Sequence, residues 1–180
     1  MKIIPCLTFL AFAATGCVSG NLKSDELKVR VGIYDSRAIA VAYVHSMQFD
    51  DLMKSKMVEM EDAKASGNMK KMTELEEWGS SHQATFHRQG FSAAPVDDIL
   101  EHIKDKLPKI AEDANVVALV SKWDKKTLKH YKSVELIDVT DQMVYQFNPN
   151  GNTLKIIKQL KEHKPIPLWQ LETLMKHEKH

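Results

Sequence analysis

Cysteine is scarce in this chain of 180 residues, and neither sign of charge is in excess. Cys6 and Cys17 are its two cysteines. The 25 Lys and Arg residues against 24 Asp and Glu residues give a formal net charge of +1. A general nucleic-acid-binding protein needs an excess of basic residues, so we expect no nucleic-acid partner.

The common catalytic and metal-binding motifs are also missing. The sequence has no HExxH motif, no CxxC motif and no glycine-rich phosphate loop. Two pairs of histidines lie close in sequence, namely His82 with His87 and His177 with His180. The first pair falls on different helix faces and the second on a terminus expected to fray, so solvated histidines are favoured over a metal site. The run Asp35-Ser36-Arg37 is better explained by helix capping than by catalysis. We therefore predict no catalytic residue, no metal, no cofactor and no enzymatic activity.

The N-terminus has the layout of a secretory signal. Lys2 supplies a positive start, an apolar run follows over residues 3–14, and the small residues Thr15 and Gly16 come next. The apolar run is far shorter than the ~20 residues that span a bilayer as a helix. We expect residues 1–16 to be a signal peptide and the rest of the chain to be exported, with a net charge near zero once Lys2 is removed.

Cys17 is the predicted lipid attachment site. The run Ala14-Thr15-Gly16-Cys17 resembles the lipobox of bacterial lipoproteins, although Ala14 stands where Leu is usual. The alternative is ordinary cleavage after Ala13. Cys6 leaves with the signal, so Cys17 has no partner for an internal disulfide, and lipidation would remove a lone exported thiol. In this family of signals the residue after the cysteine influences sorting, and Val18 is not the Asp that often retains lipoproteins at the inner membrane. The resemblance therefore favours a lipid anchor in the outer membrane, on the periplasmic side of a bacterial envelope. Residues 17–26 are the expected anchor and tether.

A strand and a long helix are expected after the tether. Apolar residues alternate over residues 27–33, as in a half-buried strand. Asp35 and Ser36 are favoured helix caps, so we predict a helix over residues 37–65. Its first part, Ile39–Val44, is apolar enough to require burial in a core.

The middle of the chain predicts an antiparallel helical hairpin that protrudes as an arm over residues 45–88. Phe49, Met53, Met57 and Met60 form one narrow stripe on a charged helix. Residues 66–68, Ser-Gly-Asn, then end the helix and turn the chain. A second stripe follows with the three-and-four spacing of a heptad seam, at Met72, Leu75, Gly79, His82 and Phe86.

The remaining pattern completes an α+β fold with a small β-sheet core and extra C-terminal helices. We predict an interruption over residues 89–94, a helix from Pro95 to Ala114, strands over 116–121 and 133–139, and a helix over 140–147. A turn over residues 148–151 leads to two amphipathic helices. The expected units are a domain over 27–147 and a helical extension over 148–180.

Three segments resemble the OmpH/Skp family of periplasmic chaperones. The carriers of the resemblance are residues 28–38 (KVRVGIYDSRA), residues 110–120 and residues 134–144 (VELIDVTDQMV), in the order strand, helical hairpin, strands, helix. The resemblance implies a trimer joined through its sheet elements, with helical arms that hold unfolded outer-membrane proteins. The balanced charge of residues 50–88 and the extension over 150–180 depart from the family pattern.

The arm supplies the candidate contact residues for a protein client. They are Met53, Met57, Met60, Met72 and Trp78. Unbranched, polarizable methionine packs against varied partners, but the same residues would also fill the seam of the hairpin. Trp78 falls beside the seam and suits either a contact or a packing role. We expect a non-enzymatic, ATP-independent chaperone-like protein for unfolded or envelope proteins, or alternatively a scaffolding lipoprotein with one defined partner.

Overall fold

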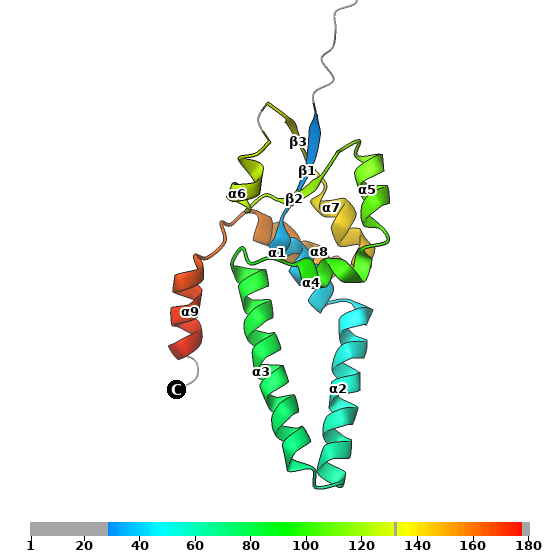
Figure 1. Cartoon of the computed structure of the whole chain (residues 1–180), viewed down its shortest axis with the longest axis vertical. Coiled ribbons are helices and arrows are strands. Elements are labelled where there is room, and N and C mark those ends of the chain that lie inside the picture. Colours follow the sequence, from blue (N-terminus) through cyan, green and yellow to red (C-terminus); the bar gives the residue numbers. More distant parts are fainter. Residues whose placement is uncertain (1–28, 132, 178–180) are drawn as a thin grey trace, which may run out of the picture.

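The computed structural model describes residues 29–131 and 133–177. A small sheet lies at one end and a long helical arm at the other (Figure 1). The predicted signal peptide, the lipid attachment site Cys17 and the tether all lie outside the described residues. None of the helices among the described residues is long and apolar enough to span a membrane.

Three parallel strands form the sheet, in the order β2-β1-β3. The central strand β1 (Arg30–Tyr34) pairs with β2 (Leu119–Ser121) on one side and with β3 (Glu135–Asp138) on the other. Gly32 lies opposite Leu119, and a Cβ at Gly32 would come within 2.8 Å of the Leu119 side chain. Glycine at this position therefore allows the close approach of the two strands.

The predicted helix over residues 37–65 is in fact two helices. The first, α1 (Ser36–Val44), ends before Ser46, and α2 (Met47–Ala65) begins after it. The Ser46 hydroxyl oxygen accepts a hydrogen bond from the Phe49 N–H at 3.3 Å and donates one to the Tyr43 carbonyl at 2.6 Å. Ser46 thus caps a new helix, which the apolar and charged pattern did not indicate.

Helix α3 (Met69–Phe91) returns along α2. The expected interruption over residues 89–94 starts later than predicted, because residues 89–91 are still helical and the break begins at Ser92. Gln89 is buried, and its Nε2 donates hydrogen bonds to the Pro95 carbonyl and to Oδ1 of Asp98. These bonds fix the turn that follows α3.

The predicted helix from Pro95 to Ala114 is broken into three short elements. They are α4 (Asp97–Leu100), the 3-10 turn η1 (Glu101–Ile103) and α5 (Leu107–Asp113). Pro108 lies in the first turn of α5, where its missing N–H is tolerated, but it could not continue an earlier helix. Strand β2 covers only the last part of the expected 116–121 strand, and α6 (Lys125–Leu128) follows it.

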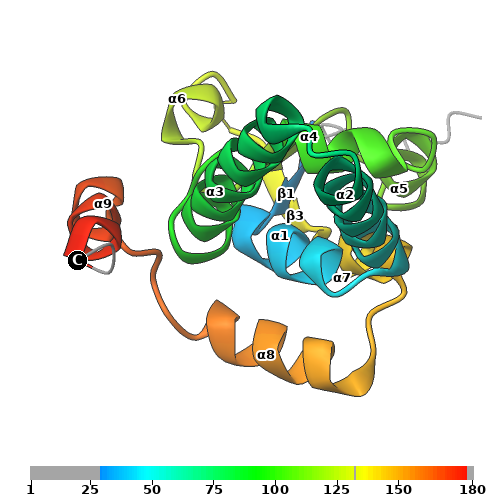
Figure 2. The same ribbon diagram turned by 90° about the horizontal axis from the view of Figure 1, so that it is seen from below.

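The C-terminal part forms four further elements. They are α7 (Thr140–Val144), the 3-10 turn η2 (Tyr145–Phe147), α8 (Gly151–Lys161) and α9 (Leu168–His177). The turn before α8 is as predicted: Asn148 has φ 50°, and the Asn150 side chain accepts the Thr153 N–H at 2.9 Å. Figure 2 shows α8 lying along α1, whereas α9 lies on the outer side of α3.

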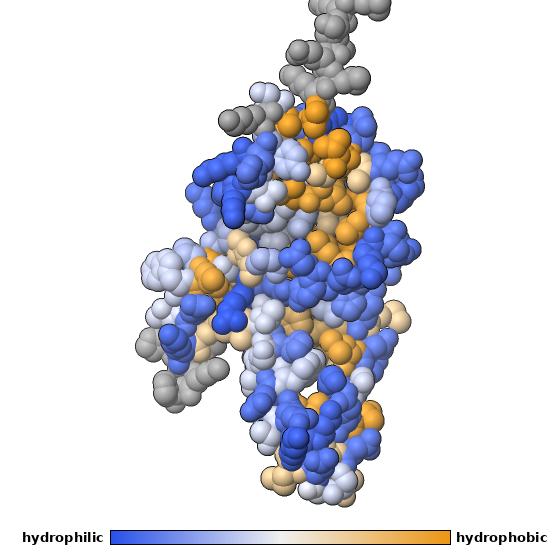
Figure 3. Space-filling view, viewed as in Figure 1, coloured by the Kyte–Doolittle hydropathy of each residue, from blue (hydrophilic) through white to orange (hydrophobic). Residues whose placement is uncertain are grey.

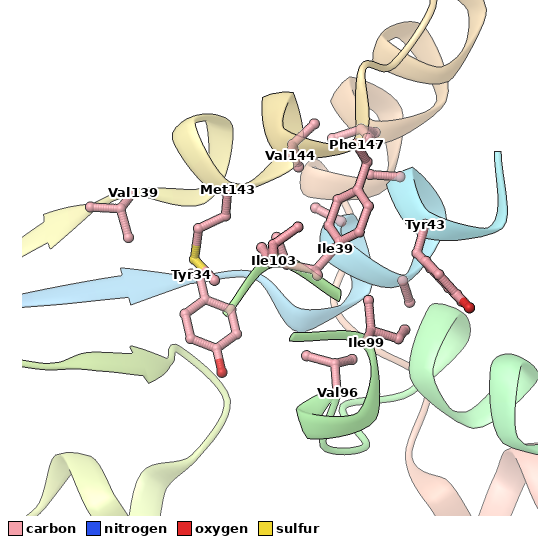
Figure 4. Packing of buried hydrophobic residues seen from close by; sticks show 14 of the residues in the cluster. Tyr34, Ile39, Tyr43, Val96, Ile99, Ile103, Val139, Met143, Val144 and Phe147 are labelled. Atoms are coloured by element: carbon pink, nitrogen blue, oxygen red, sulfur yellow. The ribbon is translucent and has the colours of Figure 1, made fainter. Parts of the chain in front are cut away.

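The hydrophobic core lies between the sheet, α1 and the elements that follow the arm (Figure 4). Ten of its members come from β1 and α1 and from the segments around α4, η1, α7 and η2, namely Tyr34, Ile39, Tyr43, Val96, Ile99, Ile103, Val139, Met143, Val144 and Phe147. Ile157 of α8 belongs to the same cluster, so α8 is part of this core. The predicted α+β class with a protruding hairpin and added C-terminal helices is confirmed.

Candidate functional site on the helical arm

The arm consists of α2 and α3, joined by the three residues 66–68. Gly67 has φ +63°, a left-handed conformation that costs glycine little. Asn68 donates its N–H to the Ala63 carbonyl at 2.8 Å, and its side chain accepts the Lys71 N–H at 3.1 Å. One residue thus ends α2 and caps α3, which sets the tip of the arm.

Aromatic rings fix the root of the arm to the core. The rings of Phe49 and Phe86 meet edge to face with centroids 5.2 Å apart, and Phe49 lies 5.6 Å from Tyr43. Tyr43 belongs to α1 and is buried in the core cluster. The two helices of the arm are therefore held together where they leave the domain.

Toward the tip, small and aliphatic side chains replace the aromatic rings between the two helices. Ala63 and Leu75 are the buried hydrophobic residues of the arm. Glu59 of α2 pairs with Lys71 of α3 at 3.0 Å and with Lys56 at 2.6 Å. Hydrogen bonds from these two lysines lower the pKa of Glu59. Both pairs lie at the surface and contribute little to stability, and only the Glu59–Lys71 pair joins the two helices.

An apolar groove runs between α2 and α3 in this part of the arm. Its volume is about 320 Å³, and we call it the arm groove. The lining residues are Met53, Lys56, Met57, Met60, Glu61 and Lys64 from α2, and Leu75, Trp78 and Gly79 from α3. Met53 is 36% exposed and Met57 61% exposed, so both thioethers are open to solvent.

The structure brings together four of the five predicted contact residues. Met53, Met57, Met60 and Trp78 line the arm groove, whereas Met72 is half-buried and is not among the lining residues. The Trp78 ring lies 4.1 Å from the His82 ring, and Lys56 Nζ lies 5.5 Å above it. Trp78 therefore forms one wall of the groove while remaining partly accessible.

The groove has an apolar lining with charged groups around it. Methionine side chains have three rotatable bonds and adapt to partners of different shape. Lys56, Glu61 and Lys64 carry both signs of charge, so no single sign dominates. Such a surface suits apolar side chains of a polypeptide rather than a small substrate that needs fixed polar contacts.

A second group of residues lies where β1 meets α1, and sequence analysis predicted only its helix cap and not its partners from after β2. The Asp35 carboxylate caps α1 by accepting the Arg37 N–H at 3.1 Å, as predicted, and pairs with the Arg37 guanidinium at 2.9 Å. Lys122 Nζ lies 2.8 Å from Asp35, and Trp123 Nε1 donates to it at 2.9 Å. We call these four residues the Asp35 cluster.

The Asp35 cluster has a buried centre, Asp35 with Arg37, and half-buried partners in Lys122 and Trp123, and it joins distant parts of the chain. Arg37 also donates to the carbonyls of Leu160 and His163, at the end of α8. Burial would raise the pKa of Asp35, but hydrogen bonds from Arg37, Lys122 and Trp123 outweigh it and lower that pKa to about 2. The carboxylate is thus fixed in its charged form, as expected for a structural ion pair.

Ser36 differs from the predicted capping role. It is the first residue of α1 and is 1% exposed, and its Oγ has no hydrogen-bond partner among the described residues. A serine next to a capping aspartate gives no sequence pattern that would reveal a buried hydroxyl without a partner.

Comparison with protein-family models, with curated proteins and with solved structures found no match to the chain.

Proposed function

We propose that this chain is a non-enzymatic binding protein of the bacterial envelope that holds unfolded or envelope proteins without ATP. The observation that carries the proposal is the arm groove, in which Met53, Met57, Met60 and Trp78 gather on a protruding hairpin. Adaptable apolar side chains with mixed charges nearby favour many weak contacts with varied sequences. The resemblance of residues 28–38 and 134–144 to the OmpH/Skp chaperones supports the same function.

The proposed setting follows from the N-terminal segment. A lipid on Cys17 would anchor the protein to the outer membrane on its periplasmic side, and the tether would leave the arm free to meet proteins in transit. By resemblance the protein acts as a homo-oligomer, with a trimer as the preferred state. Several arms around one client would raise the effective concentration of weak sites.

A scaffolding lipoprotein that binds one folded partner is the second candidate. The observation that favours it is the nearly balanced charge of the arm, which differs from the basic arms of the chaperones it resembles. The two functions predict different selectivity. A holding chaperone suppresses aggregation of several unrelated unfolded proteins, whereas a scaffold binds one folded partner through a defined patch.

The test is to shorten the arm without disturbing the core. Because Phe49 and Phe86 pack on Tyr43, replacement of residues 53–82 by a short Gly-Ser linker keeps the aromatic root. We expect the variant to retain its sheet and core, since β1, β2 and β3 pair outside the arm.

The assay measures light scattering while denatured test proteins are diluted into buffer. The full-length protein should lower scattering for unrelated clients, including an unfolded outer-membrane protein, and the shortened variant should not. If the intact protein suppresses no aggregation, the chaperone function is rejected and the scaffolding function takes its place. If the shortened variant is as active as the intact protein, the arm groove is not the site.

A further inference from the structure

A second cavity lies at the carboxyl edge of the sheet, away from the arm groove. Its volume is about 470 Å³, within the range of small-molecule sites in proteins. The lining residues are Tyr34, Ser36, Ala93, Pro95, Val96, Asp97, Leu119, Val120, Ser121, Trp123, Asp124 and Thr127. Strands β1 and β2 are parallel and both end here, and ligands of open parallel sheets bind outside the carboxyl ends of the strands.

Ser36 points to a ligand in this cavity, which we call the sheet-edge cavity. Its side chain is buried and lines the cavity, yet its Oγ has no hydrogen-bond partner among the described residues. A buried hydroxyl without a partner costs about 1–3 kcal/mol. A bound molecule whose polar group displaces the side chains that cover the Ser36 hydroxyl would remove that cost.

The charged residues that line the sheet-edge cavity are both acidic. Asp97 at the start of α4 and Asp124 before α6 bring two exposed carboxylates to it from separate elements. None of the described residues that line it is basic. Lys122 is the neighbour of Trp123 in the chain, but its ammonium group lies 2.8 Å from Asp35 and is already paired.

Tyr34 lines the same cavity as the two carboxylates. Its ring packs in the core, while its hydroxyl points away from Val139 and Met143 (Figure 4). Burial, together with the negative charges of Asp97 and Asp124, raises the pKa of Tyr34 to about 12. The phenol is therefore neutral at physiological pH and can donate or accept a hydrogen bond.

The other walls are apolar, with Val96, Leu119 and Trp123 among them. We propose that the sheet-edge cavity binds a small organic cation, with an ammonium group held by Asp97 and Asp124 and an apolar body packed against these walls. The Ser36 and Tyr34 hydroxyls orient the polar end of that ligand. This site is separate from the arm groove and does not depend on the proposed client-holding function.

The test uses phenethylamine, a primary ammonium ion with an aromatic body, and phenylacetate as its anionic counterpart. Titration of the ¹⁵N-labelled protein at neutral pH is followed through the indole N–H resonance of Trp123, assigned from its loss in Trp123→Phe. We expect saturable shifts of this resonance with millimolar phenethylamine, and binding about tenfold weaker or undetectable for phenylacetate. The indole resonances of Trp78 and Trp169 serve as internal controls and should not move.

Matched variants assign the effect to the carboxylates. Asp97→Asn and Asp124→Asn should each weaken phenethylamine binding about two- to fivefold, the range expected for a single partly exposed charge pair. Asparagine still caps α6, so Asp124→Asn keeps the hydrogen bond to the Thr127 N–H. Asp51→Asn on the arm removes the same charge away from the cavity and should leave binding unchanged. Ser36→Ala should weaken binding while the other resonances stay in place.

Three results would overturn the proposal. The first is no shift of the Trp123 resonance with phenethylamine, and the second is equal or tighter binding of phenylacetate. The third is a loss of affinity in Asp51→Asn equal to that in Asp97→Asn, which would mean attraction by overall charge only. Each outcome leaves the aggregation assay unaffected, so the two proposals fail independently.

Discussion

The indole Nε1–H of Trp123 donates a hydrogen bond to Oδ1 of Asp35 at 2.9 Å, although 88 residues separate them in the chain. The bond is possible because β2 pairs in parallel with β1, with Ser121 opposite Tyr34. The residues that directly follow the two strands are thereby brought together. A buried carboxylate with partners from two segments is costly to disturb, because removing one partner leaves charge uncompensated.

The first prediction concerns the stability contributed by Asp35. Its pKa is lowered to about 2 from an ordinary value of 3.8, so the folded state favours the charged form. The stabilisation is present above about pH 4 and is lost as the pH falls toward 2, and it amounts to about 2 kcal/mol. Urea unfolding of the full chain, followed by circular dichroism between pH 7 and pH 2, measures it.

The matched variants are Asp35→Asn and Asp113→Asn. We expect Asp35→Asn to lower the free energy of unfolding by about 3 kcal/mol at pH 7 and to flatten the loss between pH 4 and 2. Asp113 pairs with Lys109 at the surface, so its replacement should change little. An equal loss of stability below pH 4 in wild type and Asp35→Asn would contradict the assignment.

The arm could be predicted because its signals are local. The turn at Gly67 and Asn68 and the spacing of Leu75 and Phe86 lie within the segments they shape. The break at Ser46 was missed because serine is also tolerated inside helices, and only its bonds to Tyr43 and Phe49 show that it caps one. A single polar residue in a periodic pattern does not decide between these states.

The Asp35 cluster and the sheet-edge cavity could not be predicted, because both depend on strand register. Lys122 and Trp123 follow a short apolar run, and nothing in that run indicates which strand it joins or in which direction. Once Lys122 donates its N–H to the Tyr34 carbonyl at 2.8 Å, the two strand ends are fixed side by side. The orphaned hydroxyl of Ser36 follows from the same long-range arrangement.

The second prediction is that Cys17 carries a lipid in the native host. Mass spectrometry of the mature N-terminus should show a chain that begins at Cys17 with added acyl groups. Cys17→Ser should release the protein from the membrane fraction, whereas Cys6→Ser, within the predicted signal, should not. A mature chain that starts at any other residue, or at an unmodified Cys17, would reject the anchor.

The third prediction is self-association, with a trimer as the expected state. The apolar run Ile39–Val44 does not itself require a second copy of the chain, because α1 already packs against other helices of the same chain. The support comes from Val29, Val117 and Leu136, which are 50%, 70% and 49% exposed near the start of the strands. Figure 3 shows apolar surface gathered over this end of the molecule, and a three-stranded sheet alone is marginal.

Light scattering on residues 21–180 at micromolar concentration measures the state. Val117→Lys together with Leu136→Lys should shift the mass toward that of a monomer, since both place charge on the exposed apolar surface. Leu174→Lys on α9 changes an equally exposed leucine elsewhere and serves as the control. A monomer mass for the unmodified chain at all concentrations would reject self-association.

The last prediction separates contact from packing in the arm groove. Met53→Gln together with Met57→Gln removes two exposed thioethers, and glutamine keeps a side-chain length and a helix propensity close to those of methionine. Since both side chains are already open to solvent, we expect helix content and thermal midpoint to change little. Suppression of client aggregation should require roughly threefold more protein, as expected when about 0.7 kcal/mol of apolar contact is lost.

Met47→Gln with Met69→Gln is the matched control, because these methionines are 77% and 69% exposed but do not line the groove. Loss of helix content in the Met53 and Met57 variant, with suppression per folded molecule unchanged, would show instead that the two methionines serve to pack the hairpin.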